Sequence, residues 1–139
     1  MIYTLDTNIV IHYLRNEPIV HHNFNNAVLR GDNFIIPKVV DYEIRRGFRI
    51  FPAPNKEAAY QVLVKEGFCA VIEMDSYFWK RAEEVYADLY RKRLTVGEFD
   101  ILIAAFCLEN NCTLVTNNVK HFEGIDDLNI VDWLTQDEW

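Results

Sequence analysis

The sequence predicts an α/β protein, a three-layer sandwich in which helices flank a mainly parallel sheet of four or five strands. Two observations predict this class. Strand patterns alternate with helix patterns along the chain, which is typical of a parallel sheet covered on both faces. The chain has 139 residues, and 50% of them are hydrophobic, which suffices for one core. We therefore expect residues 1–139 to form a single domain.

Proline and turn residues divide the first half of the chain. A helix that follows the first strand stops before Pro18, because the residue before a proline disfavours helical geometry. The segment Gly31-Asp32-Asn33 has the composition of a turn and precedes the second strand. Pro52 follows the helix that comes after that strand. The expected elements are a strand at 2–5, a helix that runs through Leu14 and stops near residues 16–18, a helix ending near 29, a strand at 34–36 and a helix at 39–50.

The second half begins with a helix that directly follows another helix, so this pair stands outside the alternation of strands and helices. Asp75 or Ser76 then caps the next helix. Residues 129–131 form a weak edge strand near the end of the chain. The other expected elements are helices at 55–65 and 77–91 and strands at 69–72 and 113–115.

One further helix carries a single charge within a largely apolar segment. Thr95 and Glu98 have the spacing of a capping box, so this helix should begin beside Val96. Asp100 lies about one turn further, where the helix dipole favours an ionised carboxylate. Because a buried carboxylate without a partner is costly, we expect a cation beside Asp100.

Four polar side chains follow predicted strands or lie early in the helices after them, namely Asp6, Glu43, Asp100 and Asn118. In a parallel sheet, such positions converge on the carboxyl edge. Carboxylates packed together repel unless a cation joins them, and an all-oxygen set suits a hard divalent ion. We therefore expect Asp6, Glu43 and Asp100 to bind Mg²⁺ or Mn²⁺. Such an ion would activate water for attack on a phosphodiester and leave a 5′ phosphate and a 3′ hydroxyl.

Each of these residues also has a purely structural interpretation. Asp6 could be only a helix N-cap, Glu43 a solvated surface residue, and Asn118 a residue that supports a turn. Asp100 is harder to explain in this way, because it lies inside an apolar helix rather than at its cap. Only the joint occurrence of all four favours a catalytic site.

A family resemblance is carried by four segments in a fixed order, which are Met1–Asn8, Glu43, Val96–Ala105 and Leu114–Asn118 with Phe122. They resemble the PIN-domain family and, within it, the VapC-type toxin ribonucleases. The resemblance extends to about Trp133. The chain departs from the family at Glu98, where many members have Pro, and at Asn118, where many have Asp. On this resemblance, Asn118 assists three acidic residues rather than serving as a fourth.

The resemblance implies a function as well as a PIN-like fold, in which the two successive helices project from the sheet. It implies a metal-dependent endoribonuclease, the toxin of a VapBC-like toxin–antitoxin pair, which cleaves structured RNA such as tRNA. It also implies a homodimer and a small VapB-like antitoxin with a basic tail that lies in the active-site groove. An antitoxin Arg or Lys among the carboxylates would replace the charge of the metal.

Further residues are assigned to supporting roles. Thr7, Asn8 and Thr116 have side chains short enough to orient the metal ligands, although ordinary capping and turn chemistry also explains them. Two basic groups could contact the RNA backbone, but such groups are more often solvated helix faces. The basic residues are Arg45, Arg46, Arg49, Arg91, Lys92 and Arg93.

The composition limits the partners and the cellular location. The net charge of −7 argues at first against a nucleic-acid partner. Part of this negative charge comes from carboxylates that a bound metal would neutralise. An acidic chain would also suit binding to a basic segment of a partner protein. Cys69, Cys107 and Cys112 form no CxxC pair, so we expect buried thiols rather than a zinc site. No apolar run is long enough for a membrane span, and a charge follows too early for a signal peptide, so we expect a cytoplasmic protein.

Two alternatives from other classes stay open at this point. The first is a non-catalytic PIN-like module that binds nucleic acid or a protein partner, which suits the acidic composition and the missing fourth Asp. The second is a haloacid-dehalogenase-like phosphatase, which also begins with a strand that ends in Asp. That chemistry requires another Asp two residues later, where this chain has Asn8.

Overall fold

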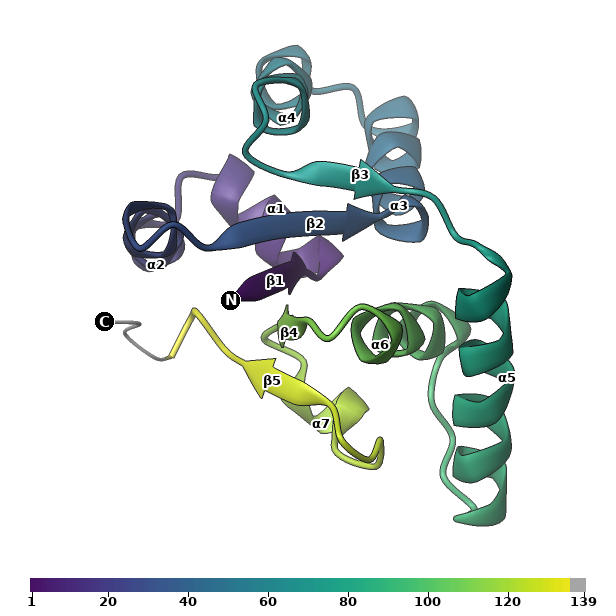
Figure 1. Cartoon of the computed structure of the whole chain (residues 1–139). Coiled ribbons are helices and arrows are strands. Elements are labelled where there is room, and N and C mark those ends of the chain that lie inside the picture. Colours follow the sequence, from purple (N-terminus) through teal and green to yellow (C-terminus); the bar gives the residue numbers. More distant parts are fainter. Residues whose placement is uncertain (136–139) are drawn as a thin grey trace.

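The computed structural model describes residues 1–135 and has the predicted α/β architecture (Figure 1). Its strands are β1 (Ile2–Leu5), β2 (Asn33–Pro37), β3 (Ala70–Ile72), β4 (Thr113–Val115) and β5 (Asn129–Val131). They form one five-stranded sheet in the order β3-β2-β1-β4-β5, and every neighbouring pair is parallel. The sheet is thus fully parallel over the described residues.

The helices agree with the predicted pattern except near the fourth strand. They are α1 (Thr7–Leu14), α2 (Pro18–Leu29), α3 (Lys38–Ile50), α4 (Pro54–Lys65), α5 (Ser76–Arg91), α6 (Glu98–Glu109) and α7 (Val119–Phe122). The short helix α7 was not predicted, because the polar segment after β4 has no helical periodicity. None of the helices within residues 1–135 is long and apolar enough to cross a membrane.

The ends of α5 and α6 test the capping predictions. Asp75 caps α5 as expected, since its carboxylate accepts a hydrogen bond from the backbone N–H of Phe78 at 2.9 Å. The capping box predicted for α6 is wrong. Gly97 is the N-cap, no side chain caps this end, and the helix begins at Glu98. Asp100 is therefore the third residue of α6, within the turn where the helix dipole favours a negative charge.

The direction of the connections reverses between β1 and β4. From β1 the chain continues to β2 and β3 on one side of the sheet, and then crosses to β4 and β5 on the other side. In open parallel sheets, such a reversal leaves a crevice at the carboxyl ends of the two central strands. The residues that follow β1 and β4 are therefore placed beside this crevice.

The two faces of the sheet have different cores. Tyr3 points to the face of α2, where its ring lies 5.8 Å from Phe34 and 5.4 Å from Trp133. Thr4 points to the opposite face, as alternation along a strand requires, and lies close to Cys107 and Cys112. These two cysteines and Cys69 are free and buried, as the sequence predicted.

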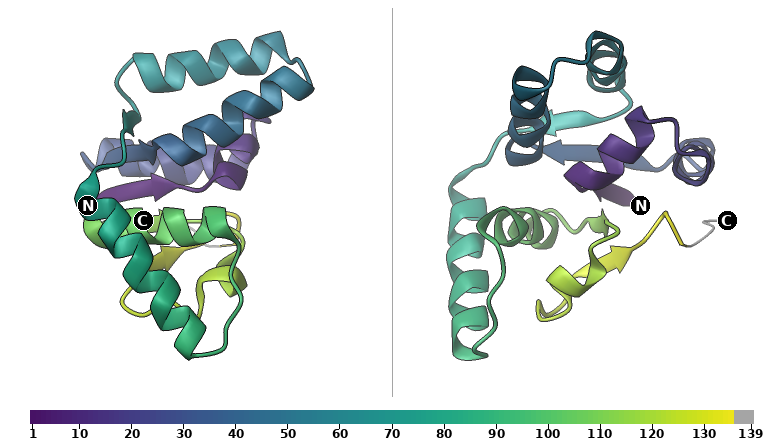
Figure 2. Two further views of the ribbon diagram at one scale, coloured as in Figure 1. Left: turned by 90° about the vertical axis from the view of Figure 1, so that its right-hand side faces the viewer. Right: turned by 180° about the vertical axis from the view of Figure 1, so that it is seen from behind.

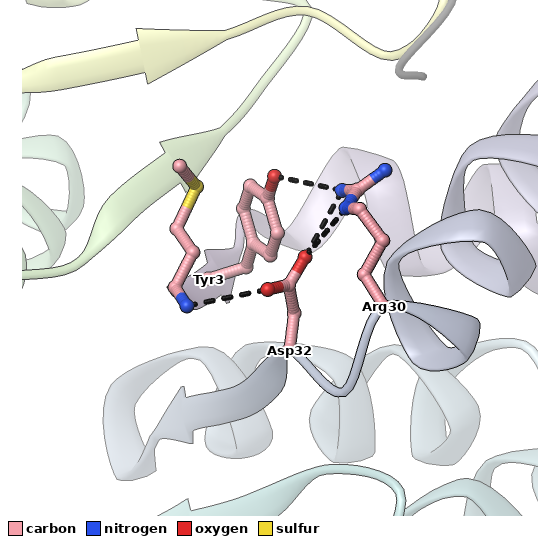
Figure 3. A network of polar contacts seen from close by, with 4 residues as sticks. Tyr3, Arg30 and Asp32 are labelled. Carbon is pink, nitrogen blue, oxygen red and sulfur yellow. Dashed lines mark hydrogen bonds and ion pairs between the residues drawn. The ribbon is translucent and has the colours of Figure 1, made fainter.

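A polar network closes the amino edge of the sheet, opposite the carboxyl ends (Figure 3). Asp32 accepts from the amino group of Met1 at 3.2 Å and from Arg30 at 3.0 Å. Arg30 also donates to the hydroxyl of Tyr3 at 3.2 Å. These contacts tie the start of β1 to the turn between α2 and β2, so this edge has a structural role.

The helical pair α3 and α4 extends past the β3 edge of the sheet (Figure 2). The helix α4 contacts α1 and β3, and Tyr60 and Leu63 are its buried residues. Most of its remaining surface is exposed. The pair therefore projects from the sheet, as predicted.

Candidate active site

The candidate active site lies at the carboxyl ends of β1 and β4. Asp6 directly follows β1, and Thr116 directly follows β4. Leu5 pairs with Val115 in the sheet, and the backbone N–H of Asp6 donates to the carbonyl oxygen of Val115 at 2.9 Å. This register brings Asp6 beside Thr116, although 110 residues separate them in the sequence.

Neutral donors hold the Asp6 carboxylate in place. Thr116 Oγ1 donates to Asp6 Oδ2 at 2.8 Å, and the backbone N–H of Thr7 donates to Asp6 Oδ1 at 2.7 Å. The second bond caps α1, so Asp6 is an N-cap, and the same carboxylate also faces Thr116. Only 4% of Asp6 is exposed. Its orientation is thus fixed by groups that carry no charge.

Glu43 joins this group through a hydroxyl. The Thr7 Oγ1 atom donates a hydrogen bond to Glu43 Oε1, which connects the first turn of α1 to α3. The helices α1 and α3 are also in contact. The solvated interpretation of Glu43 is therefore incomplete, because this half-buried carboxylate is bound to a residue next to Asp6.

Asp100 approaches from α6. Its Oδ2 atom lies 3.1 Å from His121 Nδ1, and its side chain is 23% exposed. A partner therefore stands where a cation was expected, but an imidazole carries charge only when it is protonated. His121 was given no role from the sequence, because it shows no ligand spacing and its place in α7 was not foreseen.

The acidic side chains affect one another electrostatically. Burial is the main cause that raises the pKa of Asp6 above its ordinary value of 3.8. Hydrogen bonds from Thr116 and Thr7 lower it, while the charges of Asp100 and Glu43 raise it further. No ion pair to Asp6 or Glu43 is formed within residues 1–135. Among the described residues, Asp6 and Glu43 thus have no cationic partner, and Asp100 has one only when His121 is protonated.

The donor set consists of oxygens, which suits a hard divalent ion. Within the described part of the chain, no three His, Cys, Asp or Glu side chains are gathered closely enough to hold a metal by themselves. Asp6, Glu43 and Asp100 therefore influence one another by charge without forming a closed cage. Mg²⁺ needs only one or two protein carboxylates and keeps several waters, so these oxygen donors suit it. They are the residues that could hold such an ion.

Asn118 and Asn8 border the cluster. The backbone N–H of Asn118 donates to Thr116 Oγ1 at 3.0 Å, so Asn118 helps to fix the hydroxyl that holds Asp6. Its side chain does not cap α7. Asn8 lies in the first turn of α1 and is half-buried. The roles predicted for both side chains stay predictions.

The predicted RNA-binding residues have different surroundings. Arg45 donates to Asp41 at 2.8 Å, so its guanidinium is engaged inside the protein. Lys92 pairs with Asp88 at 2.8 Å and with Asp126 at 2.9 Å. Arg46 instead lies over two aromatic rings. The RNA-binding role of these residues and of Arg49, Arg91 and Arg93 stays a prediction.

Sequence reasoning missed Asp41, the most deeply buried carboxylate of α3. Asp41 is 1% exposed and accepts hydrogen bonds from Lys38 at 3.1 Å, from Arg45 at 2.8 Å and from the hydroxyl of Tyr60 at 2.8 Å. The spacing of Lys38, Asp41 and Arg45 is that of (i, i+3) and (i, i+4) helical pairs, so a signal was present in the sequence. The contact with Tyr60 comes only from the packing of α4 on α3.

Comparison with known families agrees with this arrangement of strands and carboxylates. The sequence model that describes the family named PIN domain matches residues 3–128 of this chain. The chain belongs to the PIN domain family. This membership confirms the resemblance found in the sequence and leaves the phosphatase interpretation without support.

PIN domain relatives match over nearly the whole chain. The protein named Ribonuclease VapC2 from Rickettsia felis is 30% identical over 136 residues, which are 96% of this chain and 98% of that protein. The protein named tRNA(fMet)-specific endonuclease VapC from Salmonella typhimurium is 31% identical over 135 residues, which are 94% of this chain and 97% of that protein. The chain is therefore similar to VapC ribonucleases along almost its full length.

Solved PIN domain structures give the same result. A crystal structure of VapBC2 from Rickettsia felis bound to a promoter DNA fragment matches with a TM-score of 0.81 and 27% identity, covering 96% of this chain and 99% of that chain. DNA-bound VapBC from Salmonella typhimurium matches with a TM-score of 0.80 and 26% identity, covering 96% and 98%. Both neighbours are solved as VapBC bound to DNA.

Proposed function

We propose that residues 1–139 form a single PIN domain that acts as a Mg²⁺- or Mn²⁺-dependent endoribonuclease. The observation that supports this proposal is Asp6, a buried carboxylate at the carboxyl edge of the sheet whose pKa is raised by burial and by the charges of Asp100 and Glu43. Asp6 is buried among neutral donors and beside like charges, which is costly unless a cation is supplied from outside. A divalent ion would meet that requirement.

The proposed chemistry needs no protein nucleophile. A divalent ion held by Asp6, Glu43 and Asp100 would polarise the scissile phosphate and lower the pKa of the attacking water. Thr116 and the backbone of Thr7 keep the Asp6 carboxylate in one orientation. Because water attacks rather than the ribose 2′ oxygen, the products would carry a 5′ phosphate and a 3′ hydroxyl.

The substrate and the biological role follow from the relatives. The Salmonella typhimurium relative is named for tRNA(fMet), so we propose structured RNA such as tRNA as the substrate of this chain. The solved neighbours are VapBC complexes, so we propose that the chain is the toxin of a VapBC-like pair. A toxin that cleaves tRNA would act in the cytoplasm.

An apolar groove offers a place for the antitoxin. The groove, of about 340 Å³, lies between α1, α3 and α4 and is lined in part by Ile11, Ile44, Phe48 and Phe51, with Glu43 also in its wall. A tail that lies in this groove could place an Arg or Lys next to the carboxylates. That cation would replace the charge of the metal and block the site.

A homodimer is also part of the proposal. Trp79, Tyr86 and Tyr90 are exposed on α5 and share one helical face by their spacing. The rings of Tyr86 and Tyr90 lie 6.5 Å apart. Exposed aromatic residues gathered in this way are typical of an interaction surface, and a second copy of the chain would cover them.

The decisive experiment is cleavage of unfractionated tRNA by the purified chain with Mg²⁺, with Mn²⁺ and with a chelator. We expect cleavage with either metal, no cleavage with the chelator, and loss of cleavage in Asp100→Asn. Glu98→Gln is the matched control, because Glu98 lies two residues away on α6 and is exposed. It should cleave like the wild type.

The other outcomes separate the alternatives. Equal cleavage by the wild type and Asp100→Asn would reveal a contaminating nuclease and contradict the proposal. Binding of tRNA without cleavage under any metal condition would favour the non-catalytic module. Products with a 5′ hydroxyl would show that the ribose 2′ oxygen attacks, which would overturn the proposed chemistry.

A further inference from the structure

Two aromatic side chains stand directly beside two carboxylates of the candidate active site. Tyr42 precedes Glu43 on α3, and Phe99 precedes Asp100 on α6. The helices α3 and α6 are in contact (Figure 1). The ring centroids of Tyr42 and Phe99 lie 6.3 Å apart, and their planes differ by 27°. The two rings therefore form one platform, and the two helices that carry it also carry Glu43 and Asp100.

The platform carries a positive charge. The guanidinium carbon of Arg46 lies 5.3 Å from the centroid of the Tyr42 ring and 5.1 Å from that of Phe99. The guanidinium therefore lies over both rings and off the line that joins their centroids, which are 6.3 Å apart. Cation–π attraction to two rings holds it there.

The polar edge of this guanidinium is available to a ligand. Arg46 is exposed, and within residues 1–135 it makes neither a hydrogen bond nor an ion pair. Its neighbour Arg45 differs, because Arg45 is bound to the buried Asp41. A guanidinium that rests on aromatic faces keeps its N–H donors free for a phosphate.

The Tyr42 ring also keeps an open surface. Tyr42 is 53% exposed. Phe99 is half-buried beneath the same surface. An open aromatic ring next to a cation with free donors matches the two parts of a nucleotide, a base and a phosphate.

We propose that Tyr42, Phe99 and Arg46 bind one unpaired nucleotide of the RNA substrate, next to the phosphate that is cleaved. The base stacks on the ring of Tyr42, and Arg46 binds a phosphate of the same nucleotide. This inference rests on the proposed ribonuclease function and adds the nucleotide subsite to it.

The charge of the chain explains why such a subsite is needed. The net charge is −7, and the carboxylates at the site repel the RNA backbone. Base stacking contributes affinity that does not depend on the net charge, and it accepts every base because each has a π-face. The substrate must then present an unpaired nucleotide at a fixed distance from the cleaved bond, which selects loops over continuous helices.

The test asks whether one particular nucleotide of the RNA contacts the platform. The cleavage position is first mapped on tRNA, and a short RNA hairpin that contains it is made with each unpaired nucleotide replaced in turn by an abasic one. We expect one abasic position to lower kcat/KM of the wild type by about 5- to 150-fold, the usual value of one base stacked on an aromatic side chain.

The variants show whether Tyr42 contacts that nucleotide. Tyr42→Leu should lower kcat/KM on the intact hairpin by a similar factor and should lose its sensitivity to the abasic position. Tyr42→Trp should keep that sensitivity. Tyr77→Leu, which removes a tyrosine that is 74% exposed on α5, should behave like the wild type. Circular dichroism of each variant confirms that the fold is kept.

Three results would overturn the inference. Additive effects of Tyr42→Leu and every abasic position would show that the ring contacts no base. Dissociation of a dimer by Tyr42→Leu, with equal loss on all hairpins, would assign the platform to a second copy of the chain. A wild-type chain that cleaves no RNA would refute the ribonuclease function, and the subsite with it, whereas the first two results leave that function intact.

Discussion

Two buried carboxylates, Asp6 and Asp41, show how the same residue type serves different purposes in one domain. Both are almost fully buried, with 4% and 1% of their surface exposed. Asp6 follows β1 and caps α1, and Asp41 lies in the first turn of α3, the helix that follows β2. Their positions along the βα units are therefore similar, but their partners are not.

The partners determine the charge that each carboxylate tolerates. Burial alone would raise the pKa of Asp41, but the hydrogen bonds from Tyr60, Lys38 and Arg45 outweigh it, and the net pKa is lowered. The pKa of Asp6 is raised, because burial and nearby acids outweigh its neutral donors. Asp41 has its cations within the fold, whereas Asp6 lacks one. A buried acid without an internal cation is the one to expect at a ligand site.

The largest expected effect is a contrast between two matched variants. One variant should lose activity and keep its stability, and the other should lose stability and keep its activity. Asp6→Asn should lower kcat/KM for RNA by more than about 100-fold, because even residues that only orient a metal ligand are worth 10- to 100-fold. Its free energy of unfolding should be unchanged or higher, since Asn also caps helices well. Asp41→Asn should instead lose about 1–3 kcal/mol of stability and keep its activity when folded. Urea unfolding and kinetics measure both, and the reverse pattern would refute the distinction.

A smaller effect is expected at the hydroxyl that orients Asp6. Thr116 is fully buried, donates to Asp6 Oδ2 and accepts from the backbone of Asn118. Thr116→Val keeps the shape of the side chain but removes the hydroxyl, so we expect kcat/KM to fall by about 10- to 100-fold. Thr116→Ser keeps the hydroxyl and should retain most of the activity. Equal activity of the Val and Ser variants would show that Asp6 needs no orienting partner.

The smallest effect is a difference in pH dependence, with opposite signs at the two sites. The pKa of Asp41 lies below its ordinary 3.8 in the folded state, so its contribution to stability is present above that pH and is lost as the pH falls through the folded pKa. The pKa of Asp6 is raised, so ionised Asp6 costs stability as the pH rises from 3.8 through the raised value.

Unfolding in urea between about pH 3 and pH 7 tests these signs, because each variant removes one titrating group. The deficit of Asp41→Asn relative to the wild type should shrink toward the acidic end. Any advantage of Asp6→Asn should be largest at neutral pH and vanish in acid. Parallel pH curves for the wild type and both variants would contradict the assignment of partners.

The part of the candidate site that could be predicted from the sequence consists mainly of residues that directly follow strands. Asp6 and Thr116 directly follow short strands, and a parallel sheet must bring such positions to one edge. Asp100 was visible as a charge within an apolar helix. The start of α6 was not predictable from local signals, because Thr95 and Glu98 match a capping box that the chain does not form.

Contacts between distant elements were beyond the reach of the sequence. His121 lies beside Asp100 because α7 folds back after β4. The polar segment that forms α7 has no helical periodicity, so this helix could not be predicted. Asp41 is a central buried acid because Tyr60 of α4 packs onto it. The platform of Tyr42 and Phe99 likewise depends on the packing of α3 against α6.

The sequence by itself determined the α/β class, the order of the strands and of every described helix except α7, and which acids follow strands. These properties depend on local periodicity and on the rule that parallel strands share a carboxyl edge. Only the tertiary structure decided which acids are buried and which of them share a site. Lys38 and Arg45 pair with Asp41 along one helix, but it is the packing of α4 on α3 that brings Tyr60 onto this carboxylate. The parallel sheet and the helices packed on it bring Asp6 within reach of the charges of Glu43 and Asp100, which are distant in the sequence.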